Sequence, residues 1–120
     1  MAIASAATRQ ILAEAYKNIG ATGKAWLALH NQDPTDSGTM GELVGGSPVY
    51  ERVEFTWASG TGGTITGPPV TINTPGGPVT HASLWTAKTG GTFIDKCPLN
   101  PTQNLGGAGP VTVTPVFTQS

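Results

Sequence analysis

The sequence contains a single cysteine, few charged residues and no long apolar run. Cys97 has no partner for an internal disulfide or for a zinc site of the usual spacing, so folding must depend on side-chain packing. Charged residues make up 11% of the chain and the net charge is -1, which excludes the basic surface of a protein that binds nucleic acid or an anionic membrane. No apolar run approaches the ~18 residues of a membrane-spanning helix. The first residues also lack the basic start and apolar core of a signal peptide, so we expect synthesis in the cytoplasm.

Glycine and proline, in contrast, are abundant, with 17 and 10 residues. They separate short alternating apolar runs, so they predict turns between strands. The length of 120 residues fits one domain, which we expect to span residues 1–120. Within it, the pattern predicts an N-terminal helix over residues 5–18 and a β-sandwich body over residues 24–117, with a long loop at 31–48.

The predicted helix has clear signals at both ends and an apolar stripe. Ser5 fits the N-cap position, and Gly20 is expected to end the helix. The stripe recurs at helical spacing and consists of Ile11, Leu12, Ala15, Tyr16 and Ile19. Two interpretations stay open: the stripe packs on the sheet of its own domain, or it docks on another subunit.

The clearest β signal is a hairpin over residues 78–95. Its first strand alternates in polarity, Gly90 and Gly91 suit a tight turn, and a short second strand is expected at 92–94. Further strands are predicted at 24–30, 49–57, 64–66, 70–73 and 111–117, with Pro115 marking an edge or a bulge. The segment 96–110 contains three prolines and three glycines and is expected to be irregular. The fold class is therefore mainly β: an antiparallel β-sandwich or small barrel of six to seven short strands with one N-terminal α-helix.

Few residues point to chemistry. His30 and His81 lie in predicted strands, where a satisfied, partly buried imidazole is more common than a ligand or a base. His81 shares a strand face with Ser83, but no third group that would orient a Ser–His pair is identifiable. Cys97 also lacks an evident base. We therefore predict no catalytic, cofactor-binding or metal-binding residue, no cofactor and no enzymatic activity.

Two other groups of residues have alternative interpretations. The loop carboxylates Asp33, Asp36 and Glu42 are of a type that ligates calcium, but their spacing does not match a known calcium loop and ordinary turn chemistry explains the first two. The aromatic residues suit either the core of a sandwich or a sugar-binding face; they are Trp26, Trp57, Trp85 and Tyr50.

Several motifs resemble a known protein family. They are Leu27 to Gly38 (LALHNQDPTDSG), Glu42 with Gly45 and Gly46, Tyr50 to Arg52, Phe55 to Trp57 with Gly62 and Gly63, Val70 to Ile72, Val79 to His81, and Leu84 to Gly91 (LWTAKTGG). Their order is similar to that in small tail-fibre-like virion structural proteins of bacteriophages that infect actinobacteria, including mycobacteria. The resemblance implies a non-enzymatic protein that works in many copies on a virion.

The resemblance and the physical pattern together lead to one expectation about function. We expect a bacteriophage virion structural protein that is associated with the tail or a fibre and assembles in multiple copies through contacts with other virion proteins, as a homo-oligomer. Candidate interface residues lie in the helix and in the last strand: Ile11, Leu12, Tyr16, Val111, Val113 and Phe117. Alternative hypotheses are a capsid-surface decoration protein and a carbohydrate-binding module that adheres to a host surface glycan. We expect neither a nucleic-acid partner nor a membrane partner.

Overall fold

The computed structural model describes residues 4–19 and 23–120. Its helix, α1, spans Ala6–Lys17. The side chain of Ser5 accepts a hydrogen bond from the Thr8 amide at 3.3 Å, as an N-cap should. The predicted N-terminal helix is thus confirmed. Gly20, which was expected to end it, lies outside the described residues, and Asn18 is the C-cap.

The described residues form nine strands. They are β1 (Lys24–His30), β2 (Val53–Thr56), β3 (Ala58–Ser59), β4 (Thr64–Thr66), β5 (Val70–Thr74), β6 (Gly77–Trp85), β7 (Phe93–Leu105), β8 (Gly109–Val113) and β9 (Val116–Thr118). All strand pairs are antiparallel. The mainly β, antiparallel fold class is therefore confirmed, although the strands are more numerous than the expected six or seven.

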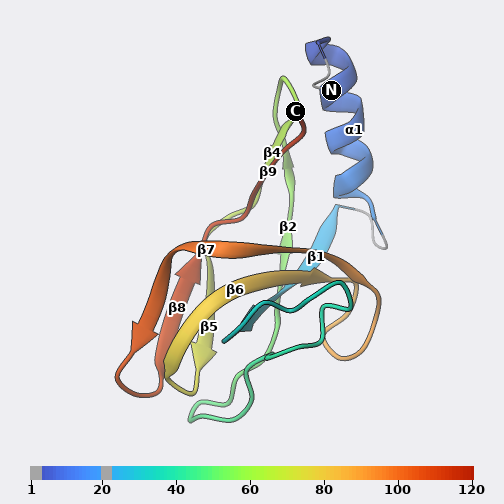
Figure 1. The fold of residues 1–120 in the computed structure, drawn as a ribbon. Helices are drawn as coiled ribbons and strands as arrows, with labels where there is room; N and C mark the ends of the chain where they lie inside the picture. Colours follow the sequence, from blue (N-terminus) through green and yellow to red (C-terminus); the bar gives the residue numbers. More distant parts are fainter. Residues whose placement is uncertain (1–3, 20–22) are drawn as a thin grey trace.

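The strands are arranged in three sheets, with orders β2-β1-β6-β7, β5-β8 and β3-β4-β9. The first two sheets contribute to one buried core and make up what we call the body. The third sheet and α1 form an arm that projects from the body (Figure 1). The molecule is accordingly elongated, with extents of 46 × 26 × 25 Å. No sheet of the described chain closes into a barrel, so the sandwich is the alternative that applies.

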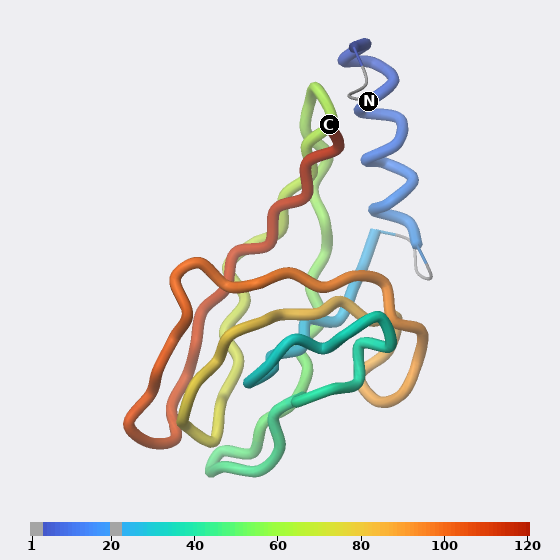
Figure 2. The backbone as a smooth tube through the Cα atoms, viewed as in Figure 1, coloured from blue at the N-terminus to red at the C-terminus, as the bar shows by residue number. Residues whose placement is uncertain are grey.

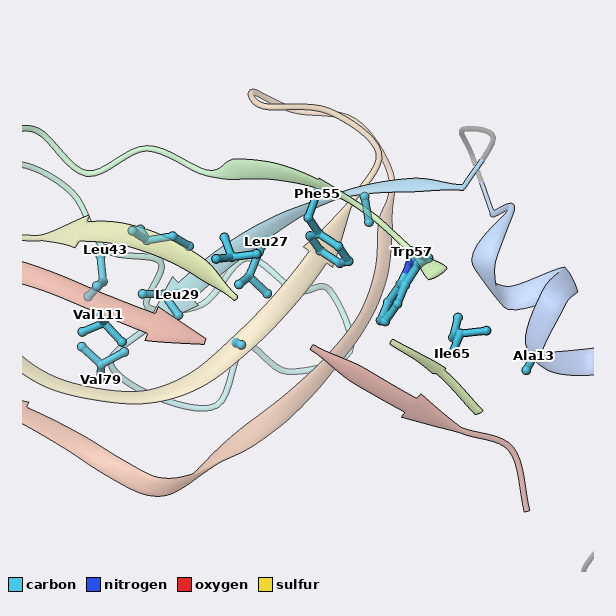
Figure 3. Close-up of a cluster of buried hydrophobic side chains, with 13 residues drawn as sticks. Ala13, Leu27, Leu29, Leu43, Phe55, Trp57, Ile65, Val79 and Val111 are labelled. Atoms are coloured by element: carbon cyan, nitrogen blue, oxygen red, sulfur yellow. The ribbon is translucent and has the colours of Figure 1, made fainter. Parts of the chain in front are cut away.

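The hydrophobic core runs from the body into the arm without a break. Figure 3 shows Val79 and Val111 at one end of the cluster, Phe55 in the middle, and Ile65 beside Ala13 of α1 at the other end. Because β2 continues almost directly into β3, and β8 into β9, strands that start in the body carry core residues into the arm. Burial of this band couples the arm to the body.

The strand β1 lies inside the main sheet, and from Ala25 to His30 both of its faces are at least partly buried. Ala25, Leu27 and Leu29 belong to the hydrophobic core. On the opposite face, His30 is fully buried, and its ring contacts residues of the β1–β2 connection, residues 31–52. Figure 2 shows this connection as the teal-to-green tube that leads from the end of β1 back to β2.

Three expectations about strands were wrong. The segment expected to be irregular, 96–110, is mostly β7, which extends to Leu105 instead of ending near residue 94. The strand β7 lies at the edge of its sheet and pairs only with β6, so a proline, which has no amide proton to donate, is tolerated on its unpaired side. The pairing of β6 with β7 also contains irregularities in register, which proline likewise tolerates. The strand expected at 49–57 is limited to β2. The strand expected at 111–117 is interrupted at Thr114 and Pro115, so that β8 ends before these two residues and β9 begins after them.

Candidate assembly surface

One face of α1 is fixed to the arm. Ala13 is fully buried, and Arg9 Nε donates a hydrogen bond of 3.0 Å to the Gly62 carbonyl. Gln10 accepts a bond of 2.9 Å from the Gly63 amide. These contacts attach the helix to the turn before β4, and they determine which side of the helix faces solvent.

The opposite face of α1 is apolar and exposed. Ile11 is 67% exposed, Leu12 40% and Ile19 41%, and Ala15 is exposed between them. The interpretation in which the stripe packs on the domain's own sheet is therefore wrong for these four residues. What we call the outer helix face consists of three residues of α1 and one residue just beyond its C-cap: Ile11, Leu12, Ala15 and Ile19.

Tyr16 belongs to the inner side and joins the helix to the strands. Its ring is stacked on Phe117 with centroids 3.7 Å apart, and it meets Trp57 edge-on at 6.2 Å. Its hydroxyl donates a hydrogen bond of 2.9 Å to Asp95. Burial and the neighbouring Asp95 carboxylate raise the pKa of the Tyr16 hydroxyl, which stays protonated and keeps donating.

Below Tyr16, a groove of about 510 Å³ opens between β7 and the segment formed by β8 and β9. Apolar side chains from the helix and from several strands line it, including Tyr16, Leu84, Leu99, Val113 and Phe117. Cys97, an exposed residue, also lines it, and partial desolvation of its thiol together with the Asp95 carboxylate raises the pKa of this thiol. An activated thiolate therefore does not fit this environment.

The six residues predicted as an interface thus fall in two places. Tyr16, Val111, Val113 and Phe117 all line the groove. Ile11 and Leu12 lie on the outer helix face. The prediction was docking through the N-terminal helix or through the last strand, and the structure presents two apolar surfaces, one on the helix and one that Tyr16 shares with the strands.

The buried histidine forms a polar cluster that the sequence did not predict. His30 Nε2 lies 2.7 Å from Ser83 Oγ, and its Nδ1 lies 2.8 Å from the Met40 carbonyl. Ser83 Oγ also accepts a hydrogen bond of 2.8 Å from Trp85 Nε1. Ser83 therefore pairs with His30 of the neighbouring strand, and His81 bonds instead to the Thr80 hydroxyl at 2.8 Å.

A second cluster centres on Arg52, which sequence reasoning missed. Its guanidinium contacts both carboxylate oxygens of Glu42, at 2.8 and 2.9 Å, and donates to the carbonyls of Ala87 and Gly90. It also lies over the Trp85 ring, 4.1 Å from the centroid. One side chain thus joins the β1–β2 connection, the β6–β7 turn and the sheet. In the sequence, Glu42, Tyr50 and Arg52 stood out as members of the motifs that resemble the phage family, with no sign that they lie together.

A comparison with protein families gives a match over residues 3–115, to the family described as podophage GP4 fiber I protein gp80. The match covers nearly the whole chain. The chain belongs to this family. It is therefore a structural protein of the bacteriophage virion, of the tail-fibre class, as the resemblance in the sequence implied. A comparison with curated proteins found no match.

In this fibre-family protein, the loop carboxylates Asp33, Asp36 and Glu42 do not come together as a metal site. Asp33 is paired with Lys96, and the contact lowers the pKa of the carboxyl group. Glu42 is held by Arg52. In the described part of the chain, no three His, Cys, Asp or Glu side chains converge as a metal ion would require.

The tryptophans of the fibre-family protein mostly occupy the interior. Trp57 is 6% exposed and Trp85 5%, which supports the core interpretation for these two. Trp26 is half-buried. Among residues 4–19 and 23–120, the helix has neither the length nor the apolar character that crossing a membrane would need.

Proposed function

We propose that this chain is a non-enzymatic subunit of a phage tail fibre and works in several copies, held by protein–protein contacts. The observation that carries the proposal is the outer helix face. Two large aliphatic side chains, Ile11 and Leu12, point to solvent from a helix whose opposite side is already fixed to the arm, and Ile19 is exposed just beyond the C-cap of that helix. Exposed apolar surface of this kind is typical of a contact with another subunit.

The groove between β7 and β8–β9 is a second apolar surface for assembly. It contains four of the six predicted interface residues, and Leu84 and Leu99 are only partly buried against the core. Its lining is predominantly apolar, as is typical of the centre of a protein–protein interface. We propose that the outer helix face and this groove contact other fibre or tail subunits, including further copies of the chain.

Copy number in the virion tests the location. Quantitative mass spectrometry of purified particles should give a handful to a few dozen copies of the chain relative to the major capsid protein. A number in simple proportion to the capsid lattice would support the alternative of capsid decoration. Complete absence from the particle would contradict the proposal. The narrower expectation of an actinobacterial phage stays a prediction, which the host range of the parent phage would test.

Substitution of the outer helix face tests the contact. Ile11→Glu with Leu12→Glu should prevent incorporation into particles, because two carboxylates would have to be buried in the interface. A matched control is Val44→Glu, since Val44 is 80% exposed on the β1–β2 connection, away from the helix. Normal incorporation of the double variant would rule out this contact.

Host-surface glycan binding is the remaining alternative from a different class. Two of the three tryptophans are too buried to serve as a platform for sugar rings, which leaves Trp26 as the candidate. A glycan array with the purified chain is expected to give no binding. Binding that is lost in Trp26→Ala, with the fold retained, would favour the adhesion module.

A further inference from the structure

The His30 cluster is a chain of hydrogen bonds in which the donor and the acceptor of each bond can be assigned. A carbonyl oxygen only accepts, so His30 Nδ1 carries the proton that bonds to Met40, at 2.8 Å. The Nε2 atom is then an acceptor, and Ser83 donates its hydroxyl proton to it at 2.7 Å. The oxygen of Ser83 accepts in turn from Trp85. The geometry therefore specifies the neutral imidazole and its tautomer.

This chain of bonds connects the main sheet to the β1–β2 connection. Met40 belongs to the connection, whereas Ser83 and Trp85 lie in β6. Near the same point, the Leu43 amide bonds to the Leu29 carbonyl at 3.0 Å. His30 is fully buried and Ser83 is 1% exposed, so the imidazole has no access to solvent while the connection is bonded to the sheet.

We propose that His30 is an acid-sensitive latch, and that a proton added to its Nε2 atom releases the β1–β2 connection from the sheet. The added N–H would point at Ser83 Oγ, and the serine proton would lose the acceptor that it uses in this structure. A buried positive charge would also have to be accommodated without water. Opening of the connection removes both penalties, because it exposes the imidazole.

Burial and the neighbouring charges together determine how well the closed form tolerates the imidazolium. Glu42, from the connection, favours it, but this carboxylate is already paired with Arg52. Arg52 and His81, the cross-strand partner, oppose it. Tyr50 bonds to Glu42 and to the Leu29 amide and adds no charge. Burial dominates and lowers the pKa of His30 below its ordinary value of 6.5.

The direction of the pH effect follows from this lowered pKa. The open form binds a proton at the ordinary value, and the closed form binds it only at lower pH. The closed form is therefore fully favoured above pH 6.5 and loses stability as the pH falls below it. Because one proton is involved, the equilibrium constant for closing falls by at most about tenfold for each pH unit.

Amide hydrogen exchange on the full chain at pH 7.5 and 5.0, corrected for the intrinsic rate, tests the latch. The amides of Asn31 and Leu43, which are bonded when the connection is closed, should lose protection at the lower pH by up to about tenfold per unit. His81→Gln, a matched loss of the other histidine, should keep this response. In His30→Gln the response should disappear. Wild-type protection that does not change with pH would overturn the proposal.

A second measurement tests the proposal without the His30→Gln variant, in case that variant does not fold. The chain has two histidines, so NMR can follow each ring through the titration. The His30 signal should titrate below pH 6.5, together with the loss of protection at Leu43. Ser83→Ala removes the donor that favours neutral His30, so it should shift both changes to higher pH. Titration of His30 without any change at Leu43 would also overturn the proposal.

Discussion

Removal of the Arg52 side chain is expected to destabilise the fold strongly. Arg52 is 9% exposed and Glu42 23%, and their contact joins both oxygens of the carboxylate. The same guanidinium bonds to the Ala87 and Gly90 carbonyls, at 3.1 and 3.0 Å. Arg52→Ala therefore breaks four hydrogen bonds and leaves a partly buried carboxylate with Tyr50 as its remaining partner.

The size of the effect follows from burial. Loss of one partner from a fully buried ion pair costs about 3–5 kcal/mol. Because Glu42 retains some exposure, we expect Arg52→Ala to lower the free energy of unfolding by about 3 kcal/mol, at the low end of that range. Arg52→Lys keeps the charge but loses the bidentate geometry, so it should cost about 1–2 kcal/mol.

Urea denaturation monitored by tryptophan fluorescence is the assay, since Trp85 lies directly beneath the guanidinium. The matched control is Lys88→Ala. Lys88 pairs with Glu51 at 3.0 Å, but the two side chains are 51% and 54% exposed, so the loss should stay below about 0.5 kcal/mol. Equal effects of Arg52→Ala and Lys88→Ala would refute the argument from burial.

The same pair also contributes to acid stability. Burial raises the pKa of Glu42, but the hydrogen bonds from Arg52 and Tyr50 outweigh it, so the net shift is below the ordinary value of 4.5. A lowered carboxylate pKa contributes stability that is present above pH 4.5 and is lost as the pH falls through the folded value. Arg52→Ala should reduce this part of the pH dependence, measured as urea midpoints between pH 6 and 3.

Three further substitutions test local contacts by the same denaturation assay. Gly38 has φ +74°, and a Cβ there would overlap the Phe93 ring, whereas Gly45 has φ +84° and open space around it. Gly45→Ala should cost about 1 kcal/mol and Gly38→Ala at least about 1 kcal/mol more; equal losses would contradict the predicted clash. Tyr16→Phe keeps the ring stacking but removes the bond to Asp95, so it should cost about 1 kcal/mol, and an unchanged midpoint would show that this bond does not fix the helix.

Local signals in the sequence predicted the elements whose determinants are local. Ser5 caps α1 as its residue type indicated, and the hairpin around Gly90 and Gly91 connects β6 and β7 as expected. The alternation from Lys24 to His30 also corresponds to β1. Short-range geometry, namely a cap, a turn and a period of two, determines each of these features.

The features that the sequence did not predict depend on the relative position of distant segments. The irregular interpretation of 96–110 assumed that prolines interrupt a strand, but an edge strand with one partner tolerates them. The periodicity of the helix identified its apolar residues but not whether they face the domain or solvent. The hydrogen bonds of Arg9 and Gln10 to the turn before β4 determine this orientation.

The polar clusters around His30 and Arg52 could not be predicted from the sequence either. Ser83 and His81 stand two positions apart on one strand, and that spacing suggested a possible pair. The register that places Ala28 opposite Ser83 brings His30 diagonally to the serine instead. Arg52 bonds to residues up to 38 positions away, and no sequence pattern links them.

The position of the two chain ends in the fold makes the molecule convenient to orient in a particle. The start of α1, among the first described residues, and the C-terminal end lie near the tip of the arm, far from the turns at 75–76 and 106–108 (Figure 1). An epitope fused to either end would mark the same pole of a subunit 46 Å long. Immuno-electron microscopy with two such fusions would therefore report the polarity of the subunit along the fibre twice, from independent labels.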